Sequence, residues 1–285
     1  PWTRISQIMQ ITRLPAIFLI ALSFFVTSCT KTLPSQNLTV HFIDVGQGDA
    51  ILIDLGKTEV LIDGGDKNSG AARYVRPYVD GPLEVLVATH PHSDHIGGLI
   101  DVLSSYMVAD IWLNGENTTT ASFSRFMSAV NAEGAAVHVA ERGDNMRVGN
   151  LTFVVLNPGR PLATDPNNNS IVLTLGYGNT NFLFTGDAEV ETEAKILAQS
   201  VIHITDIDVL KIGHHGSRTA SSPAFLEVIR PEVAVYSAGA GNTYRHPHHE
   251  TLVNLSKIGA KIYGTDVHGT VVITTDGKSY SVKMQ

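Results

Sequence analysis

The chain has 285 residues, of which 43% are hydrophobic and 16% are charged, and it contains a single cysteine. This composition is typical of a globular protein with a sizeable core, and it excludes a disordered chain or an intramolecular disulfide. The formal charge of -7 argues against a surface built for tight, non-specific nucleic-acid binding, although the average can hide a local basic patch.

The N-terminal segment has the pattern of an export signal. Two arginines precede the uncharged stretch 14–26, which is shorter than the ~20 residues of a typical membrane-spanning helix. Small residues then precede Cys29, as in a bacterial lipobox. We therefore expect residues 1–29 to be a lipoprotein signal peptide, Cys29 to be lipidated and residues 30–37 to be a tether. The protein would be exported and lipid-anchored to a bacterial membrane, on its periplasmic or extracellular face; an uncleaved anchor or a buried thiol at Cys29 are the alternatives.

From Leu38 to Gln285, apolar runs alternate with helical patterns. This order predicts one layered α/β domain over residues 38–285, with its sites at strand ends. The predicted strands are 38–43, 51–53, 60–62, 83–88, 111–113, 137–139, 151–156, 171–175, 182–184, 207–212, 233–237, 261–265 and 270–274. The predicted helices are 71–79, kinked or ended by Pro77, then 99–106, 122–132, 188–199, 223–229 and 252–258.

A dense group of candidate metal ligands lies between a predicted strand and a predicted helix. His90, His92, Asp94 and His95 directly follow the apolar run 83–88 and precede a Gly-Gly turn. Rigid elements on both sides of such a loop can direct its side chains to one point. Nitrogen and oxygen donors without thiolates suit zinc, manganese or iron. We expect a metal centre here, with room for two adjacent ions, rather than a run of solvated histidines.

An acidic residue ends another buried strand. Asp187 follows the apolar run 182–184. Burying a carboxylate is costly unless it is paired or bound to a metal. Asp187 is therefore a candidate oxygen ligand between two ions, and the alternative is a helix cap for residues 188–199.

Two further histidine groups follow predicted strands. His214 and His215 are flanked by glycines after strand 207–212, where the backbone can come close to a ligand. His246 and His248 follow strand 233–237.

Two other features carry less functional weight. The glycine-rich turn 46–49 lacks the spacing of a phosphate-binding loop, and we interpret it as a hairpin turn near the mouth of the site. His138 lies in an alternating strand without a partner motif and is interpreted as structural.

Six short motifs follow one another in the chain. They are Phe42–Ala50, Thr89–Gly98, Asn169–Ile171, Phe184–Asp187, Leu210–Ser217 and His246–His248. Together they resemble the metallo-β-lactamase superfamily and, more narrowly, the extracytoplasmic domain of ComEC-type DNA-internalisation proteins and their stand-alone relatives. The resemblance covers nearly all of residues 38–275. It implies an α/β fold, the four-layer αββα sandwich, with a binuclear site at one edge.

The resemblance also implies roles for the first group of ligands. His90 and His92 would hold one ion, Asp94 and His95 would hold the second, and Asp187 would bridge the two. Asp94 would in addition orient the attacking water or move its proton.

The later histidines have less certain roles. A histidine late in the chain usually completes the second metal site in this family, and His246 follows a strand in the appropriate order. We expect His246 to be that ligand, and His214 or His215 to contact the scissile group or give a proton to the leaving oxygen. The reverse assignment is open.

One departure from the family pattern concerns the first ion. Many members supply a third histidine before the bridging aspartate, and this chain offers Asn169 and Ser170 there. The first ion should then bind more weakly, which favours a harder ion such as manganese. We expect two divalent metal ions, zinc or manganese. Asn169, Ser170, His215 and His248 are candidate metal or substrate contacts.

The resemblance favours a metal-dependent hydrolase that acts on a phosphodiester, such as DNA. A small ester of the phosphocholine type in the cell envelope is the alternative substrate. A lipoprotein that binds DNA or a partner through a degenerate site is the non-enzymatic alternative. The sequence shows none of the many apolar spans of a full ComEC-type transporter, so any role in DNA uptake would need a separate membrane transport protein.

Overall fold

A computed structural model describes residues 36–199 and 204–285. The predicted signal peptide, the lipidation site Cys29 and tether residues 30–35 lie outside the described residues, so these remain predictions. Within the described part of the chain, no helix has both the length and the apolar character needed to cross a membrane.

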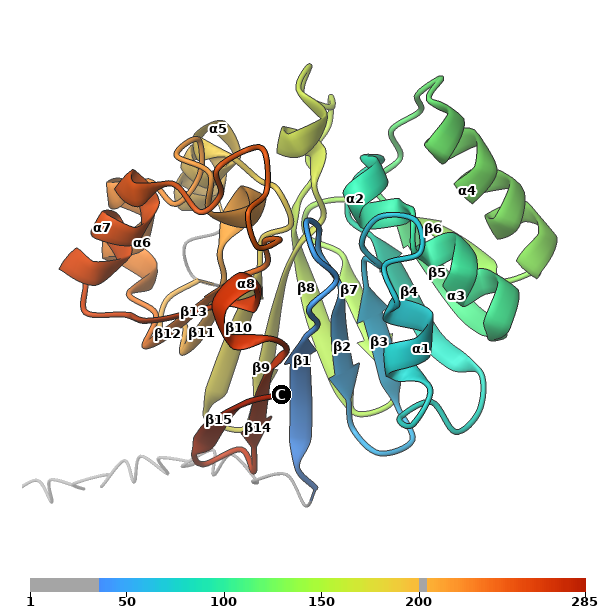
Figure 1. Cartoon of the computed structure of the whole chain (residues 1–285), viewed down its shortest axis with the longest axis horizontal. Helices are drawn as coiled ribbons and strands as arrows, with labels where there is room; N and C mark the ends of the chain where they lie inside the picture. Colours follow the sequence, from blue (N-terminus) through green and yellow to red (C-terminus); the bar gives the residue numbers. More distant parts are fainter. Residues whose placement is uncertain (1–35, 200–203) are drawn as a thin grey trace, which may run out of the picture. The chain divides into compact units, whose positions relative to one another are not determined.

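The described residues form two sheets, one of eight strands and one of seven (Figure 1). The eight-stranded sheet contains, in spatial order, β15 (Tyr280–Met284), β14 (Val271–Thr275), β1 (Leu38–Phe42), β2 (Ile51–Asp54), β3 (Glu59–Ile62), β4 (Leu83–Ala88), β5 (Val108–Leu113) and β6 (Ala136–Val139). The seven-stranded sheet contains β13 (Lys261–Gly264), β12 (Val233–Tyr236), β11 (Val209–Lys211), β10 (Thr180–Phe184), β9 (Val172–Tyr177), β8 (Leu151–Asn157) and β7 (Asn145–Val148).

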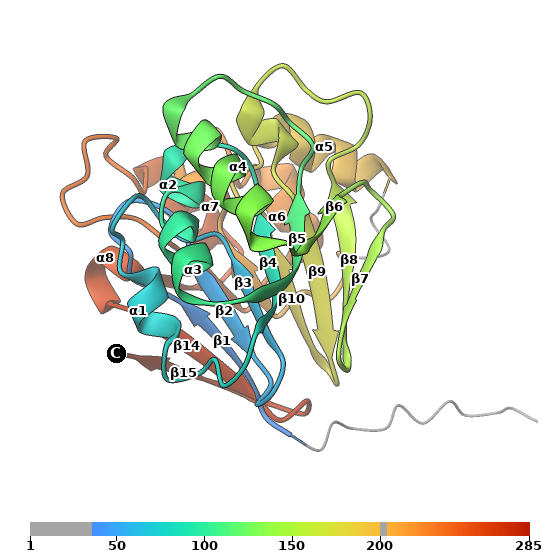
Figure 2. The same ribbon diagram turned by 90° about the vertical axis from the view of Figure 1, so that its right-hand side faces the viewer.

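Helices cover the outer face of each sheet (Figures 1 and 2). The eight-stranded sheet is covered by α1 (Ala71–Val75), α2 (Ser93–Ile96), α3 (Leu99–Ser105) and α4 (Ala121–Glu133). The seven-stranded sheet is covered by α5 (Val190–Gln199), α6 (Pro223–Ile229) and α7 (His249–Lys257). The short helices are α8 (Thr265–His268) and the 3-10 turns η1 (Pro166–Asn169) and η3 (Gly213–Gly216). The predicted four-layer αββα sandwich is thereby confirmed.

Alternation along the central strands explains why their sequences are apolar throughout. In β10, Phe182 and Phe184 enter the core between the two sheets, whereas Leu183 enters the core beneath the helices. In β4, Val87 likewise enters the core between the sheets, and Leu86 enters the core beneath the helices. Successive side chains of a strand point to opposite faces, so a strand buried on both faces needs apolar residues at every position.

The elements that the sequence did not predict lie at sheet edges or are very short. These are β7, β15, α8, the turns η1 and η3, and α2, which contains Asp94 and His95 of the segment predicted as a loop. Only Met146 and Val148 of β7 point inward, and β15 is half exposed. An edge strand has one solvated side, so its pattern is weaker than that of a central strand. The predicted helix 71–79 ends at Val75, before Pro77, because proline cannot continue the hydrogen-bonding pattern.

Candidate metal centre

The predicted ligands come from loops at the carboxyl ends of parallel strands in both sheets. Strands β3 and β4 are parallel neighbours in one sheet, and β10, β11 and β12 are parallel neighbours in the other. Ligand sites in α/β proteins form at such strand ends. The loops also pack closely against each other, since a Cβ atom at Gly98 would overlap the Gly64 oxygen. Glycine at this position thus allows the Gly-Gly turn to contact the loop after β3.

Asp187 lies at the centre of the cluster. Its side chain is only 2% exposed. Its Oδ2 atom lies within 3.9 Å of the Nε2 atoms of four histidines, two from the segment after β4 and two from the segment after β11. The distances are 3.9 Å to His90, 3.3 Å to His95, 3.8 Å to His214 and 3.3 Å to His215. This central position is the one expected of a bridging carboxylate.

His95 is held in place by a residue that the sequence argument did not single out. The Nδ1 atom of His95 lies 2.8 Å from Oδ2 of Asp63, which directly follows β3 and is fully buried. The same carboxylate accepts hydrogen bonds from the backbone and the hydroxyl group of Thr89, at 2.8 and 2.7 Å. A carboxylate on one ring nitrogen fixes the orientation of a histidine ligand and leaves Nε2 free to bind.

His215 is oriented in the same manner by a backbone carbonyl. Its Nδ1 atom donates to the Ser237 oxygen at 2.9 Å, and Asp49 Oδ1 lies 3.3 Å from the same nitrogen. Its Nε2 atom faces two carboxylates, with Oδ2 of Asp94 and Oδ2 of Asp187 each 3.3 Å away. Ligand atoms of His95, Asp187, His215 and Asp49 lie within 4.8 Å of one another, and Asp94 joins this group through His215.

These contacts test whether the cluster fits a cation. The Nε2 atoms of His95 and His215 are buried without a hydrogen-bond partner among the described residues. Since Nδ1 of His215 donates to a carbonyl, the neutral ring has a lone pair on Nε2 that points at carboxylate oxygens. Two such lone pairs repel each other unless a proton or a metal ion lies between them. The residues present therefore fit a divalent cation.

The protonation preferences of the cluster reflect the same electrostatics. Burial disfavours a charge on His215, but the Asp187 and Asp49 carboxylates outweigh burial and raise the pKa of His215 well above its ordinary value. Burial likewise disfavours charge on Asp187, yet His215 and His95 hold its pKa well below the usual range. A negatively charged cluster that attracts protons this strongly also attracts metal cations.

His90 and His92 form a second converging pair. The Nε2 atom of His90 lies 3.0 Å from Nδ1 of His92. The Nδ1 atom of His90 is 3.2 Å from the Thr89 hydroxyl, which itself donates to Asp63. Burial, followed by the charge of His95, lowers the pKa of His90 well below its ordinary value, so that this ring is neutral at pH 7. A neutral imidazole is the form that binds metals.

The residues at the position of the absent third histidine lie behind this pair. The Ser170 hydroxyl is 3.4 Å from Nδ1 of His90 and accepts the backbone N–H of Asp187 at 3.1 Å. The Asn169 side chain instead forms hydrogen bonds with the backbone of Ala163 and with the Glu116 carboxylate. Ser170 thus supports His90 and Asp187 from behind, and Asn169 shapes the neighbouring loop.

His214 also contacts Asp187, with Nε2 at 3.8 Å from Oδ2. Its Nδ1 atom lies 2.9 Å from Oε1 of Glu189, and the Thr219 hydroxyl donates to the same oxygen at 2.6 Å. His214 and His215 both have left-handed backbone conformations, with φ angles of 46° and 54°. This unusual backbone directs two consecutive imidazoles into the same cavity, and it costs about 1–3 kcal/mol per residue.

His246 lies at the rim of the cluster. Its ring centroid is 5.4 Å from that of His214 and 6.1 Å from that of His215, and it stacks on Tyr244. Its Nδ1 atom is buried without a hydrogen-bond partner among the described residues. Burial, aided by the neighbouring histidines, lowers its pKa to about 4. His248 is farther out and accepts the backbone N–H of Arg218 through Nδ1.

A cavity of about 510 Å³ opens onto the cluster. Asp94, Asp187 and the histidines form its floor, and Tyr244, which is 63% exposed, lies at its mouth. The structure thus brings together most of the predicted ligands. The predicted site residues that line this cavity are His92, Asp94, Asp187, His214, His215 and His246.

Four supporting residues were not predicted from the sequence. Asp63 and Glu189 hold the rings of His95 and His214, while Asp49 lies behind His215 and forms a 2.7 Å ion pair with the fully buried Lys211. Asp49 belongs to the glycine-rich turn that we interpreted as a hairpin near the site mouth. Asp63 ends a buried apolar strand, as Asp187 does, so the same argument about the cost of burial could have identified it. His138 stays outside the site, bound to Asp110.

Comparisons with known proteins agree with this geometry. The model of the metallo-beta-lactamase superfamily matches residues 43–240. The chain is 31% identical over 252 residues to ComE operon protein 3 of Bacillus subtilis, a match that covers 81% of this chain and 32% of that protein. It is 30% identical over 260 residues to Recombination protein 2 of Haemophilus influenzae, which covers 89% of this chain and 31% of that protein. The chain thus spans about a third of the length of these relatives.

A solved structure supports the fold independently. The metallo-beta-lactamase fold protein YhfI from Bacillus subtilis superposes with a TM-score of 0.56 and 14% identity, over 84% of this chain and all of that chain. At this identity the likeness concerns the fold alone. The predicted resemblance to ComEC-type competence proteins is confirmed by the sequence relatives, and the fold is that of metal-dependent hydrolases. The chain belongs to the metallo-beta-lactamase superfamily.

Proposed function

We propose that the protein is a metal-dependent phosphodiesterase with a centre for two divalent ions, zinc or manganese. The observation that carries the proposal is the convergence of four histidine Nε2 atoms on one oxygen of the buried Asp187. Neutral imidazoles together with carboxylates form the ligand set that such ions take in hydrolases.

Two groups of residues would hold the ions, with Asp187 between them. When bound, such ions lower the pKa of a water molecule and offset negative charge at an attacked phosphoryl group. The ligands of the first ion would be His90 and His92, and those of the second would be Asp94, His95 and His215.

We assign the remaining histidines to the substrate, which reverses the expected roles of His215 and His246. His215 is buried between carboxylates, whereas His246 lies at the cavity rim with an unpartnered Nδ1 atom. His246 is neutral at pH 7 and would bind the substrate by a hydrogen bond. The Glu189 carboxylate accepts the Nδ1 proton of His214 and would offset the charge of a doubly protonated ring, from which Nε2 would give its proton to the leaving oxygen. Asp94, whose side chain is 28% exposed, is accessible to the attacking water.

We propose DNA or another phosphodiester as the substrate because the most similar sequence relatives include ComE operon protein 3 and a protein named Competence protein ComA. The cavity volume of about 510 Å³ would also admit a small phosphocholine-type ester. The fold does not choose between these substrates, since one scaffold serves many reactions.

The test is hydrolysis by the purified full chain with manganese, zinc or no metal. Substrates would be bis(p-nitrophenyl) phosphate, p-nitrophenyl phosphorylcholine, and single- and double-stranded DNA. We expect metal-dependent turnover of the diesters that is lost in Asp187→Asn, a variant of nearly equal shape. No turnover of any diester by a metal-loaded protein would contradict the proposal, and retained DNA binding without metal uptake would support the non-enzymatic alternative.

We also propose that the protein is exported and tied to the membrane by lipid at Cys29. The small residues before Cys29 support this, as does the association of the relatives' names with competence. A separate membrane transport protein would be its partner in any DNA uptake. Labelled palmitate should be incorporated into the wild-type protein and not into the Cys29→Ala variant. Equal labelling of both proteins would contradict lipidation at this residue.

A further inference from the structure

A surface hollow leads away from the metal cavity and collects positively charged side chains. The metal cavity shares Ser93 and Ser122 with a hollow of about 280 Å³, which also contains Lys67 and Arg125. That hollow shares Asp101 with a further one of about 560 Å³ between α1 and α3. We call these two adjoining hollows the cationic groove.

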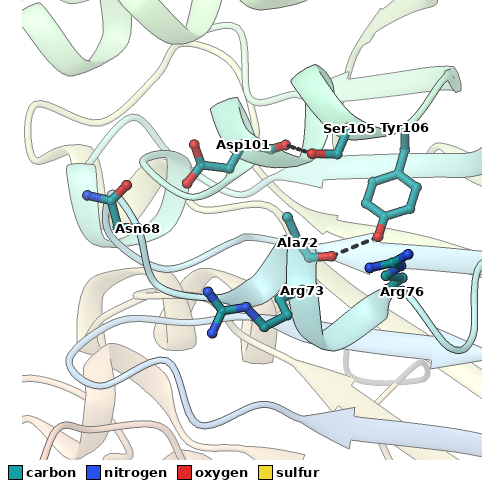
Figure 3. Close-up of a pocket in the computed structure, with 8 residues that line it drawn as sticks. Asn68, Ala72, Arg73, Arg76, Asp101, Ser105 and Tyr106 are labelled. Carbon is teal, nitrogen blue, oxygen red and sulfur yellow. Dashed lines mark hydrogen bonds between the residues drawn. The ribbon is translucent and has the colours of Figure 1, made fainter.

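The far end of the groove presents two guanidinium groups. Figure 3 shows Arg73 of α1 and Arg76, which directly follows α1, in the same hollow as Asp101 and Ser105 of α3 and Tyr106, the residue after α3. Tyr106 is held in place, since its hydroxyl donates to the Ala72 carbonyl at 2.8 Å. Among the described residues, neither guanidinium forms an ion pair, although Asp101 lines the same hollow.

The groove differs from another basic hollow of the protein. In that hollow, Arg142 donates to the Leu156 carbonyl, Arg160 donates to the Asn114 carbonyl, and Lys195 pairs with Glu191 at 2.7 Å. Those positively charged side chains already bond to other groups of the protein. Their hollow shares no lining residue with the metal cavity. The cations of the groove are exposed and continuous with the site.

Charge argues for a ligand in the groove. The chain carries a formal charge of -7, yet the groove places Lys67, Arg73, Arg76 and Arg125 against Asp66 and Asp101. An acidic protein repels polyanions in general, so it needs a local basic path to hold one at its site. A small ester would be fully accommodated by the metal cavity and would not reach Arg73 or Arg76.

We propose that a single-stranded nucleic acid runs from the metal cavity along the cationic groove, with Lys67, Arg125, Arg73 and Arg76 contacting successive phosphates. This inference rests on the proposed phosphodiesterase function and selects a polymer as its substrate. Exposed Tyr244 at the cavity mouth supplies a ring face on which a base can stack, and phosphate polymers other than nucleic acids have no bases. Tight, sequence-independent binding of single strands typically combines such a charged groove with aromatic rings.

The experiment measures binding of a fluorescently labelled 12-nucleotide single strand by anisotropy, in chelator, so that no hydrolysis occurs. It compares the full chain with Arg73→Glu/Arg76→Glu and with a control, Lys257→Glu/Lys278→Glu, which makes the same change in net charge at exposed positions outside the groove. We expect the groove variant to bind about tenfold or more weakly at low salt, and the slope of log K against log salt to shrink by about 1.4. The control should stay within about twofold of wild type.

Each outcome decides between alternatives. Equal losses in the two double variants, or no loss in either, would overturn the groove as the binding path. Inorganic polyphosphate that competes as well as unlabelled oligonucleotide would overturn the choice of nucleic acid. Hydrolysis of bis(p-nitrophenyl) phosphate is measured on separate, metal-loaded samples of the wild-type protein and of the Lys257→Glu/Lys278→Glu control. Its absence from both would reject the phosphodiesterase function, which keeps that failure separate from a failure of the groove.

Discussion

The two halves of the proposed metal centre are built differently. In the second half, His95 and His215 contact Asp187, Asp94 contacts His215, and the two imidazoles are oriented by Asp63 and by a backbone carbonyl. In the first half, only His90 and His92 converge, and hydroxyl groups lie behind His90. A carboxylate partner makes a histidine ligand more basic than a hydroxyl partner does. The histidines of the second half are therefore the better oriented and more basic ligands, and this half should bind its ion first.

The largest expected effect comes from removing the residue that both halves share. Asp187→Ala should abolish binding of both ions and reduce hydrolysis to background, because Oδ2 of Asp187 is the common neighbour of the histidine nitrogens. Metal content by mass spectrometry and turnover of bis(p-nitrophenyl) phosphate would measure this. A folded variant that kept two ions and its activity would refute the shared position.

Removing one histidine from each half in turn should show which half binds its ion more tightly. His92→Ala should keep one tightly bound ion, since Asp94, His95, His215 and Asp187 are intact. His215→Ala should lose that ion and, at the same low metal concentration, retain almost none. Equilibrium dialysis of the two variants, with an affinity difference of about 10–100-fold, would establish the order of the halves. Equal retention in both would contradict it.

Asp63→Asn probes the residue that reaches both halves. Asp63 binds His95 directly and His90 through the Thr89 hydroxyl. We expect metal affinity to fall about 10–100-fold, with the larger loss in the second half. Asp66→Asn is the matched control, because Asp66 is an exposed neighbour that only bonds the Lys67 backbone. Similar losses in both variants would point to a general charge effect instead.

The smallest effect is expected from Ser170→Ala. Loss of one hydroxyl behind His90 should weaken the first ion about fivefold, in keeping with ~1 kcal/mol for a hydrogen bond. The second ion should weaken less, because Ser170 reaches it only through the backbone N–H of Asp187. Calorimetric titration resolves the two affinities. A change confined to the second ion would place Ser170 in the wrong half.

The sequence predicted those parts of the site that are written as local motifs. His90, His92, Asp94 and His95 lie within six residues, and their loop follows a recognisable buried strand. Asp187 was found because a carboxylate at the end of an apolar strand is costly to bury.

Contacts between distant loops could not be predicted in this way. Asp63 reaches His95 across 32 positions, and Glu189 reaches His214 across 25. The choice between His215 and His246 depended on which ring lies between the carboxylates, and both follow predicted strands. Similarly, the edge strands β7 and β15 take their structure from a single neighbour each, so their short, half-polar sequences predicted little.

The most direct test of the account is titration of the metal-free full chain with manganese and with zinc, followed by metal content and by phosphodiester turnover at each step. We expect two ions per chain, one bound tightly and one bound about 10–100-fold more weakly. Turnover should rise as the weaker ion binds. Two ions of equal affinity would contradict the unequal halves. Metal binding without turnover of any phosphodiester would contradict the proposed function.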